Sequence, residues 1–357
     1  MEIIVTIGPK SIDKNILSKL GFAGATSFRI NLSHSNQETL NAYYKSFKDC
    51  DIKPSIDTQG AQVRVSSNPK KESYKEGEEM IISHISNKHL IDCDLSINHS
   101  EFFHQLEEGD FVKFGFDGLT AKIITVDKLK YIASTKIITQ GSIAINKALD
   151  ISEKTFNLEP LTTFDKFTIK NSYKQGVETI YVSFCNDAEA IAEVKSLIKN
   201  NYPSSARIPN IIAKIETKKA VVNLKEIAEN CNGILIDRGD LSREVSISRI
   251  PAIVNHILET CLELKKPCFV ATNILDQMIL ERLPSRAEIS DIYNLLDKEV
   301  SGIVLAAEVA IGNHPIECVQ VIRHMSIVHA IEKKKAQGID VTNTEFPRLQ
   351  NHLKAWL

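Results

Sequence analysis

The chain has 357 residues, which is too long for a single small hydrophobic core and indicates two or three domains. It is 43% hydrophobic and 25% charged, with a formal net charge of −2, so neither long disordered tracts nor a nucleic-acid or acidic-membrane partner is expected. No apolar run approaches the roughly 20 residues that span a bilayer. The dispersed cysteines are typical of reduced cytoplasmic thiols, and we therefore expect a cytoplasmic protein.

The predicted elements alternate between strand and helix up to about residue 60 and again from about 155 to 325. Apolar residues spaced by three and four predict the helices, for example at 187–200, 219–230, 249–265 and 286–299. Short apolar runs closed by polar residues predict eight strands: 3–8, 26–33, 53–58, 179–184, 211–216, 233–237, 268–272 and 302–308.

Eight strands with helical crossovers suit an α/β fold of the closed parallel (β/α)8 type, the TIM barrel. An open doubly wound sheet is the alternative, although its glycine-rich first turn, GxGxxG, is absent. Residues 64–150 instead show short strand-like segments separated by turn signals such as Glu-Gly-Asp and Phe-Asp-Gly. We expect a small β-barrel domain inserted between barrel segments 1–63 and 151–331, and a charged C-terminal tail over 332–357.

Polar side chains close the predicted barrel strands, and (β/α)8 enzymes carry their chemistry at these strand ends. A closed barrel would bring together one lysine, two arginines, several carboxylates and several hydroxyls. These residues are Arg29, Asn31, Ser33, Asp57, Thr58, Arg64, Ser183, Lys214, Glu216, Asp240, Thr272 and Glu308.

The stretch IIAKIETKKA, residues 211–220, places Lys214 and Glu216 two positions apart, so both side chains point the same way on a strand. Glu216 and Asp240 suit Mg²⁺, which takes oxygen ligands from one or two carboxylates and from its substrate. Lys214 supplies a positive charge for an oxygen-rich anion such as a phosphate. Gly239 begins a predicted helix whose open N–H groups favour a carboxylate or a phosphate.

Each of these residues also has a structural explanation. A lysine and a glutamate two positions apart are most often a surface pair, Asp57 and Thr272 could cap helices, and Glu308 could buttress the barrel mouth. His34 could be a structural histidine. The joint occurrence at successive strand ends favours a functional site, in which the oxygens of Asn31, Ser33, Asp57 and Thr58 suit a monovalent cation.

The order of motifs resembles the pyruvate kinase family from residue 2 to about 325. VTIGPKS is similar to the family's CTIGPAS, SIDTQGAQVR to LLDTKGPEIR, and IIAKIETKKAVVNLKEI to IISKIENQEGVDNIDEI. GILIDRGDLSREV resembles GIMVARGDLGVEI, and KPCFVATNILDQMI resembles KPVIVATQMLDSMI. The resemblance implies phosphoryl transfer from phosphoenolpyruvate to ADP, giving ATP and pyruvate in glycolysis, with the inserted domain as a lid.

The resemblance also implies catalytic roles. Lys214 would neutralise the transferring phosphoryl group, and Arg29 would hold the phosphate from another side. Glu216 and Asp240 would hold Mg²⁺ (or Mn²⁺). Thr272 would lie near the carbon that gains a proton.

Further binding roles follow in the same way. The N–H groups of Gly239 and Asp240, with the Thr272 hydroxyl, would hold the substrate carboxylate. The implied K⁺ ligands are Asn31, Ser33, Asp57 and Thr58. The implied nucleotide contacts are Pro9, Asn31, His34, Arg64 and Lys147.

The chain departs from the family pattern on the nucleotide side. The family's SGETAKG is AAEVAIG here, so Ala306 and Val309 replace a serine and a threonine, and Ile311 replaces a basic residue. Gln62 replaces a glutamate linked to K⁺ dependence, which leaves that dependence open. Of two lid aspartates, only Asp117 is retained, because Phe116 replaces the other.

The family's C-terminal effector domain is not expected after this barrel, so we expect a homodimer or a monomer without that effector control. Another hypothesis is a Mg²⁺-dependent barrel enzyme that binds phosphoenolpyruvate or a 2-oxo acid but uses another phosphoryl acceptor, or aldolase or lyase chemistry. A third is a non-catalytic, metabolite-binding relative, against which the retained Lys214, Glu216, Asp240 and Thr272 argue.

Overall fold

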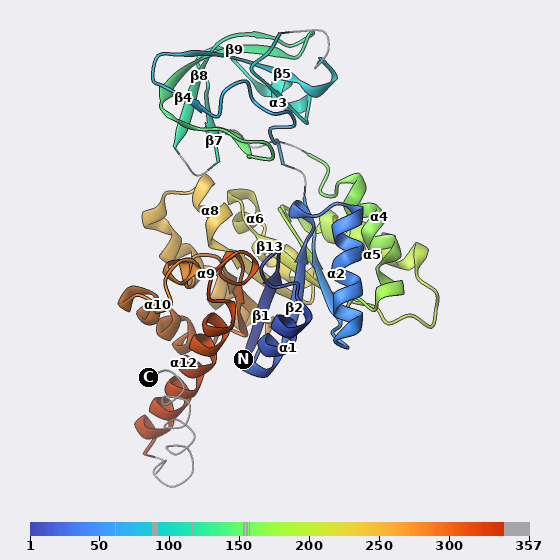
Figure 1. Cartoon of the computed structure of the whole chain (residues 1–357), viewed down its shortest axis with the longest axis vertical. Helices are drawn as coiled ribbons and strands as arrows, with labels where there is room; N and C mark the ends of the chain where they lie inside the picture. Colours follow the sequence, from blue (N-terminus) through green and yellow to red (C-terminus); the bar gives the residue numbers. More distant parts are fainter. Residues whose placement is uncertain are drawn as a thin grey trace. The chain divides into compact units, whose positions relative to one another are not determined.

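The computed structural model describes residues 1–60, 62–87, 92–115, 118–152, 154, 156 and 158–338 (Figure 1). The chain divides into two compact units, one formed by 1–60 with 160–357 and the other by 61–159. The second unit is wider than the predicted insertion because Val63 belongs to its hydrophobic core and Leu158 packs against that core.

Eight parallel strands of the first unit close into a barrel in the order β1-β16-β15-β14-β13-β12-β3-β2. β1 pairs with both β2 and β16, which confirms the predicted barrel and rules out the open sheet. The barrel strands are β1 (Glu2–Ile7), β2 (Ser27–Asn31), β3 (Pro54–Asp57), β12 (Thr179–Val182), β13 (Asn210–Ile215), β14 (Gly233–Asp237), β15 (Cys268–Ala271) and β16 (Gly302–Leu305).

Helices follow the strands and cover the outside of the barrel (Figure 1). They are α1 (Lys14–Ala23), α2 (Gln37–Asp49), α4 (Thr163–Asn171), α5 (Ala188–Asn201), α6 (Lys218–Val222), α7 (Leu224–Asn230), α8 (Arg238–Glu244), α9 (Ile250–Glu263), α10 (Arg286–Asp297), α11 (Ala307–Ala310) and α12 (Pro315–Ala336). Short 3-10 turns lie at Leu32–His34, Ser172–Gln175, Ile247–Arg249 and Asp276–Ile279.

Local sequence explains most of the helix boundaries. Ser285 and Glu288 form a capping box at the start of α10, in which each side chain accepts a hydrogen bond from the other residue's N–H. The helix predicted over 219–230 is instead two short helices that meet at Asn223. α12 continues to Ala336, past the predicted start of the tail at 332, and residues 339–357 of that tail lie outside the described residues.

The hydrophobic core of the first unit has two layers. Alternate strand residues pack outward against the helices, and a separate cluster that includes Ile4, Tyr181 and Ile212 fills the barrel interior. This apolar filling leaves the strand ends for polar side chains. No helix in the described part of the chain is long and apolar enough to cross a membrane.

The second unit is a small β domain built on a curled six-stranded sheet. Residues 64–65 bridge its two ends, because Val65 pairs with Ile97 and Arg64 pairs with Ala148. Phe102 and Phe103 of α3 (Glu101–Gln105) are fully buried in its core. The sheet has the order β11 (Leu149–Ile151), β7 (Phe111–Phe114), β8 (Leu119–Asp127), β9 (Ile132–Thr139), β5 (Glu79–His84) and β6 (Leu95–Ile97), and β4 (Ser73–Tyr74) pairs with β10 (Gly141–Ser142).

The chain is held together at the point where it leaves and re-enters the first unit. The buried carboxylate of Asp165 accepts hydrogen bonds from Gln59 N at 2.7 Å and Gly60 N at 3.2 Å on the outgoing segment. It also accepts from Thr162 N at 3.0 Å on the returning segment. Gly60 has φ +63, and a Cβ there would lie 2.7 Å from the Phe184 ring, so glycine is required.

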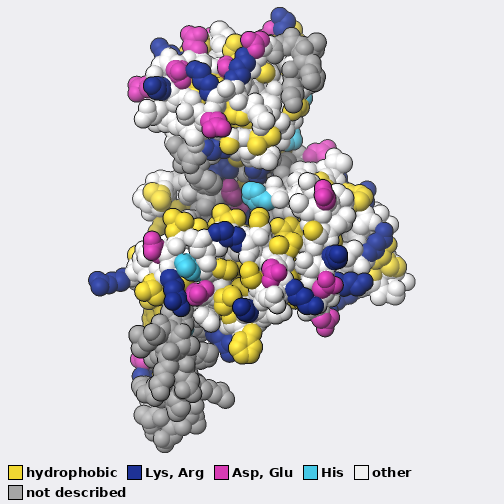
Figure 2. Space-filling view, viewed as in Figure 1, with side chains coloured by type: hydrophobic (Ala, Val, Ile, Leu, Met, Phe, Trp, Pro, Cys, Tyr) yellow, Lys and Arg dark blue, Asp and Glu magenta, His cyan; other side chains and the backbone are white. Residues whose placement is uncertain are grey.

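Charges on the outer surface are mixed in sign. On the face shown in Figure 2, Lys and Arg side chains are interspersed with Asp and Glu side chains. Neither sign of charge dominates the described residues on that face.

Candidate active site

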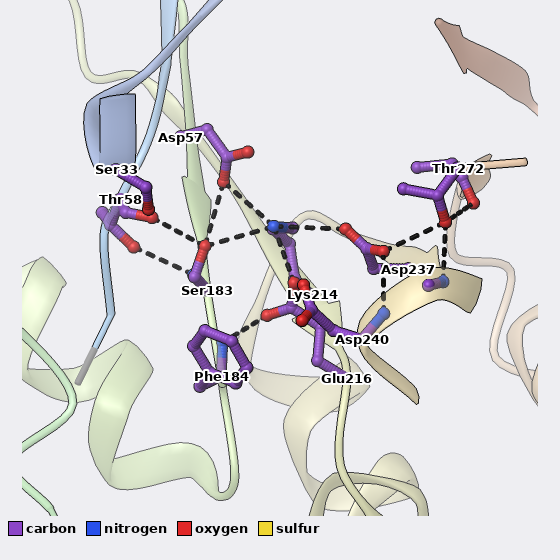
Figure 3. A network of polar contacts seen from close by, with 12 residues as sticks. Ser33, Asp57, Thr58, Ser183, Phe184, Lys214, Glu216, Asp237, Asp240 and Thr272 are labelled. Atoms are coloured by element: carbon purple, nitrogen blue, oxygen red, sulfur yellow. Dashed lines mark hydrogen bonds and ion pairs between the residues drawn. The ribbon is translucent and has the colours of Figure 1, made fainter. Parts of the chain in front are cut away.

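Lys214 is the centre of a buried cluster of charges at the C-terminal end of β13 (Figure 3). Its Nζ lies 2.7 Å from Glu216 Oε1, 3.4 Å from Asp57 Oδ1 and 3.5 Å from Asp237 Oδ2. Nζ also donates a hydrogen bond to Ser183 Oγ at 3.2 Å. Burial alone would lower the pKa of Lys214, but the three carboxylates outweigh burial and raise it, so the ammonium group stays charged.

The alternation of β13 explains why the lysine lies there. Ile211, Ala213 and Ile215 pack outward into the helix layer, whereas Ile212 packs in the barrel interior. Lys214 shares the interior face with Ile212, one position from the strand's end. The strand therefore anchors Lys214 with apolar packing and delivers its ammonium group to the barrel mouth.

Arg29 is the second buried cation of the cluster. Its Nη1 lies 3.0 Å from Asp57 Oδ2, so Asp57 bridges Arg29 and Lys214. Its Nε and Nη2 donate to Thr6 Oγ1 at 3.1 and 2.8 Å, and its guanidinium lies 5.5 Å from the centre of the Tyr181 ring. Contacts from β1, β3 and β12 thus fix the guanidinium. Arg29 is buried, with 2% of its surface exposed.

Three carboxylates form a candidate metal site beside Lys214. One oxygen from each of Glu216, Asp237 and Asp240 lies within 4.8 Å of the others. Burial, together with the charges of Asp237 and Asp240, outweighs Lys214 and raises the pKa of Glu216 to about 8. This excess of carboxylate charge fits a hard divalent cation, which prefers oxygen ligands and would displace the proton of Glu216.

Comparison with known proteins decides which family this site belongs to. The family model "Pyruvate kinase, barrel domain" matches residues 1–319. The chain belongs to the pyruvate kinase family. It is 32% identical over 335 residues to plastidial pyruvate kinase 3 of Arabidopsis thaliana, a match that covers 91% of this chain and 57% of the relative. It is 29% identical over 343 residues to the pyruvate kinase of Thermotoga maritima, covering 93% of this chain and 71% of that protein.

Solved structures show the same fold. Two crystal structures of pyruvate kinase from Cryptosporidium parvum have TM-scores of 0.80 and 0.83 at 23% sequence identity. The match covers 93% of this chain and 72% and 73% of those chains. The chain spans less than three fifths of the length of the plant pyruvate kinases it matches.

Asp237 is not among the residues predicted from the sequence, and it stands where the family's VARGD has alanine. It is the last residue of β14 and accepts a hydrogen bond from Asp240 N at 3.4 Å, which caps α8. Burial alone would raise the pKa of Asp237, but Lys214 and Arg29 hold it below its usual range, so the carboxylate is charged. The signal was present in GILIDRGD, since this aspartate also closes a predicted strand.

Thr272 holds a strained position directly after β15. Its φ is +67, a conformation that a β-branched residue rarely adopts. Its hydroxyl accepts from Gly239 N at 2.8 Å and lies 3.1 Å from Asp237 Oδ1, to which it can donate. Arg238 fixes the strained peptide by donating from Nη2 to Thr272 O at 2.9 Å. Strain that its surroundings maintain is a mark of functional positions.

The residues predicted for K⁺ lie at the ends of two adjacent strands. Asn31 and Asp57 are partners in the register of β2 and β3. The hydroxyl of Ser183 lies 3.1 Å from Asp57 Oδ1 and 2.7 Å from Thr58 O, and it can donate to either oxygen. Asn31 Oδ1 accepts a hydrogen bond from Ser33 N at 2.9 Å. The structure thus brings these oxygens to one part of the mouth, and K⁺ binding there stays a prediction.

The residues predicted for the nucleotide are divided between the units. Pro9, Asn31 and His34 belong to the first unit, and Arg64 and Lys147 belong to the second. Within the second unit Arg64 Nη1 donates to Asn146 O at 2.8 Å, and Lys147 Nζ donates to Ser142 O at 2.9 Å. Their nucleotide role stays a prediction. Phe116 and Asp117 lie outside the described residues.

Glu308 buttresses the mouth, as the structural alternative predicted. Its Oε1 accepts hydrogen bonds from Ile274 N at 3.3 Å and Leu275 N at 3.2 Å, and its Oε2 accepts from Ala306 N at 2.8 Å. The side chain therefore ties the segment after β15 to the segment after β16. Nearby, Ile311 is 53% exposed.

Glu308→Ala is expected to lower the free energy of unfolding by about 3 kcal/mol, because it leaves buried N–H groups without acceptors. Urea unfolding followed by circular dichroism measures this change. Glu332→Ala is the control, since Glu332 is an exposed residue that pairs with Lys335 on α12, and its effect should stay below about 0.5 kcal/mol. Equal effects of the two substitutions would contradict the buttressing role.

Proposed function

We propose that this chain transfers the phosphoryl group of phosphoenolpyruvate to ADP and thereby forms pyruvate and ATP, with Mg²⁺ as cofactor. The observation that carries the proposal is the buried pair of cations, Lys214 and Arg29, beside a three-carboxylate cluster at the mouth of a pyruvate kinase barrel. Phosphoryl transfer depends on positioning and charge neutralisation more than on covalent chemistry.

The cationic and the anionic side chains of the site have different proposed roles. Lys214 and Arg29 would hold the oxygens of the transferring phosphoryl group, and the raised pKa of Lys214 keeps it cationic throughout. Glu216 and Asp240 would hold Mg²⁺, which supplies charge neutralisation to the oxygens of the substrate. The P–O bond of the enol phosphate would break as an oxygen of the β-phosphate of ADP bonds to phosphorus. The enolate left behind would then take a proton on its carbon from water, and Thr272 would orient that step.

The test is an assay of the purified chain with phosphoenolpyruvate, ADP, Mg²⁺ and K⁺, coupled to detection of pyruvate. We expect stoichiometric pyruvate and ATP and loss of activity after removal of Mg²⁺, and replacement of K⁺ by tetramethylammonium tests the K⁺ dependence that Gln62 leaves open. Binding of phosphoenolpyruvate without any pyruvate formation would contradict the proposal.

A second candidate keeps the phosphoenolpyruvate site and changes the acceptor. The observation that favours it is Ile311, an exposed apolar side chain where the family has a basic residue. The same assay decides between the two: pyruvate released with another phosphoryl acceptor, or from a 2-oxo acid without ADP, would support the second candidate.

Thr272→Ala is expected to lower kcat about 100-fold, because it removes the hydroxyl that contacts Gly239 N and Asp237. Thr272→Ser keeps the hydroxyl, relaxes the β-branched strain and is expected to stay within about tenfold of the wild-type kcat. Steady-state kinetics of pyruvate release measures both. A serine variant as slow as the alanine variant would show that the methyl group, and not the hydroxyl, is needed.

A further inference from the structure

Asp237 places a third carboxylate beside Glu216 and Asp240 in the candidate site. Both of its oxygens are engaged: Oδ2 lies 3.5 Å from Lys214 Nζ, and Oδ1 lies 3.1 Å from the Thr272 hydroxyl (Figure 3). These are the cation and the hydroxyl that the proposed function assigns to the anionic substrate. With alanine, as in the family's VARGD, neither group would have this internal partner.

We propose that Asp237 competes with the anionic substrate for Lys214 and Thr272, and thereby sets how tightly this site binds phosphoenolpyruvate and related 2-oxo acids. This inference rests on the proposed function. It assigns Asp237 to substrate specificity and gives it no part in bond making.

The balance of charge around Lys214 supports the competition. Two buried cations, Lys214 and Arg29, already face the buried carboxylates of Asp57 and Asp237. A substrate that carries its own carboxylate and phosphate therefore enters a region with no spare positive charge from these side chains. Each buried carboxylate that remains a few ångströms away weakens the binding of such an anion.

Asp237 cannot move away to make room. It is the last residue of β14, where it pairs with Ala271 in the barrel register, and it is 4% exposed. Its Oδ1 also accepts from Asp240 N at 3.4 Å and so caps the following helix. The carboxylate is fixed by the strand on one side and by the helix on the other, and the substrate must bind beside it.

Two variants and one control test the proposal. Asp237→Asn keeps the shape and the capping oxygen but removes the charge, and Asp237→Ala restores the family residue. Asp297→Asn is the matched control, because Asp297 is an exposed residue at the end of α10, 3.5 Å from His329, and lies outside the cluster around Lys214. Urea unfolding of each variant shows that it is folded before binding is measured.

Binding is measured by calorimetry without ADP, in the presence of Mn²⁺, with phosphoenolpyruvate, oxalate and oxamate as the three probes. Oxalate presents a carboxylate beside a second anionic oxygen, whereas oxamate has an amide NH2 in place of one oxygen and so carries one negative charge fewer. Both Asp237 variants are expected to bind phosphoenolpyruvate and oxalate at least tenfold more tightly than the wild type, with a smaller gain for oxamate. The control should change by less than about twofold. In turnover, the gain should appear as a lower KM for phosphoenolpyruvate.

Three results would overturn the proposal. The first is unchanged or weaker binding of phosphoenolpyruvate and oxalate by both variants. The second is a loss of Mn²⁺ affinity without substrate, which would make Asp237 a metal ligand. The third is a loss of kcat above about 100-fold at unchanged KM, which would make it a proton-transfer residue. If no form of the protein binds phosphoenolpyruvate, the proposed function fails, and the oxalate comparison alone decides the role of Asp237.

Discussion

Lys214→Met is expected to lower kcat by at least about three orders of magnitude, because it removes the ammonium group from the transferring phosphoryl group. The structure adds a second expected effect. Without Lys214, the carboxylates of Asp57, Glu216 and Asp237 face one another in a buried site, and we expect a loss of about 3–5 kcal/mol in the free energy of unfolding.

The two effects must be separated by measuring kcat and urea unfolding on the same preparation, with Mg²⁺ present in both. The double variant Lys214→Met with Asp237→Asn removes one of the opposed carboxylates and is expected to recover part of the stability but none of the activity. Lys219→Met is the matched control, because Lys219 lies on α6 in the same stretch and pairs with Asp187 on the surface. A folded Lys214→Met variant with wild-type kcat would contradict the role of this lysine.

Glu216→Gln is expected to weaken Mn²⁺ or Mg²⁺ binding by at least about 100-fold, because it replaces a charged oxygen ligand by a neutral amide. The substitution keeps the volume of the side chain and an oxygen that can accept from Phe184 N, which donates to Glu216 Oε2 at 2.6 Å. Mn²⁺ titration followed by electron paramagnetic resonance measures the affinity. Glu189→Gln, on the exposed first turn of α5, is the control and should leave the affinity unchanged.

The pH dependence of Mn²⁺ binding is a second test of the metal role of Glu216. Because the pKa of Glu216 in the metal-free protein is raised from 4.5 to about 8, its protonated form prevails below that pH and a cation must displace the proton. The affinity of the wild type for Mn²⁺ should therefore fall as the pH decreases from about 8 to 6, by at most about tenfold per unit. The Gln variant should lack this slope. A wild-type affinity that is independent of pH would contradict the metal role of Glu216.

The chain's barrel was predictable because its signal is local and repeated. Each parallel strand is buried on both faces, so it appears in the sequence as a short continuous apolar run, and eight such runs were identified. One predicted helix was wrong in its extent. The helix predicted over 219–230 breaks at Asn223, and neither its apolar spacing nor its helix formers signal the break.

The candidate site was predictable in part. Lys214, Glu216 and Asp240 were identified because polar residues at the end of an apolar run are conspicuous. Asp237 was not predicted, although it closes a predicted strand. It caps α8, and only the structure shows that its other oxygen faces Lys214 from the neighbouring strand.

By itself, the sequence determined the alternation of strands and helices, the family and the residue types at the barrel mouth. Only the tertiary structure decided which charged side chains from separate strands become partners. It placed Lys214 among three carboxylates, assigned Glu308 to backbone support and forced Thr272 to a positive φ. The physical reason is that residue type and spacing are local properties, whereas charge neutralisation in a buried site depends on which strands the closed barrel makes neighbours.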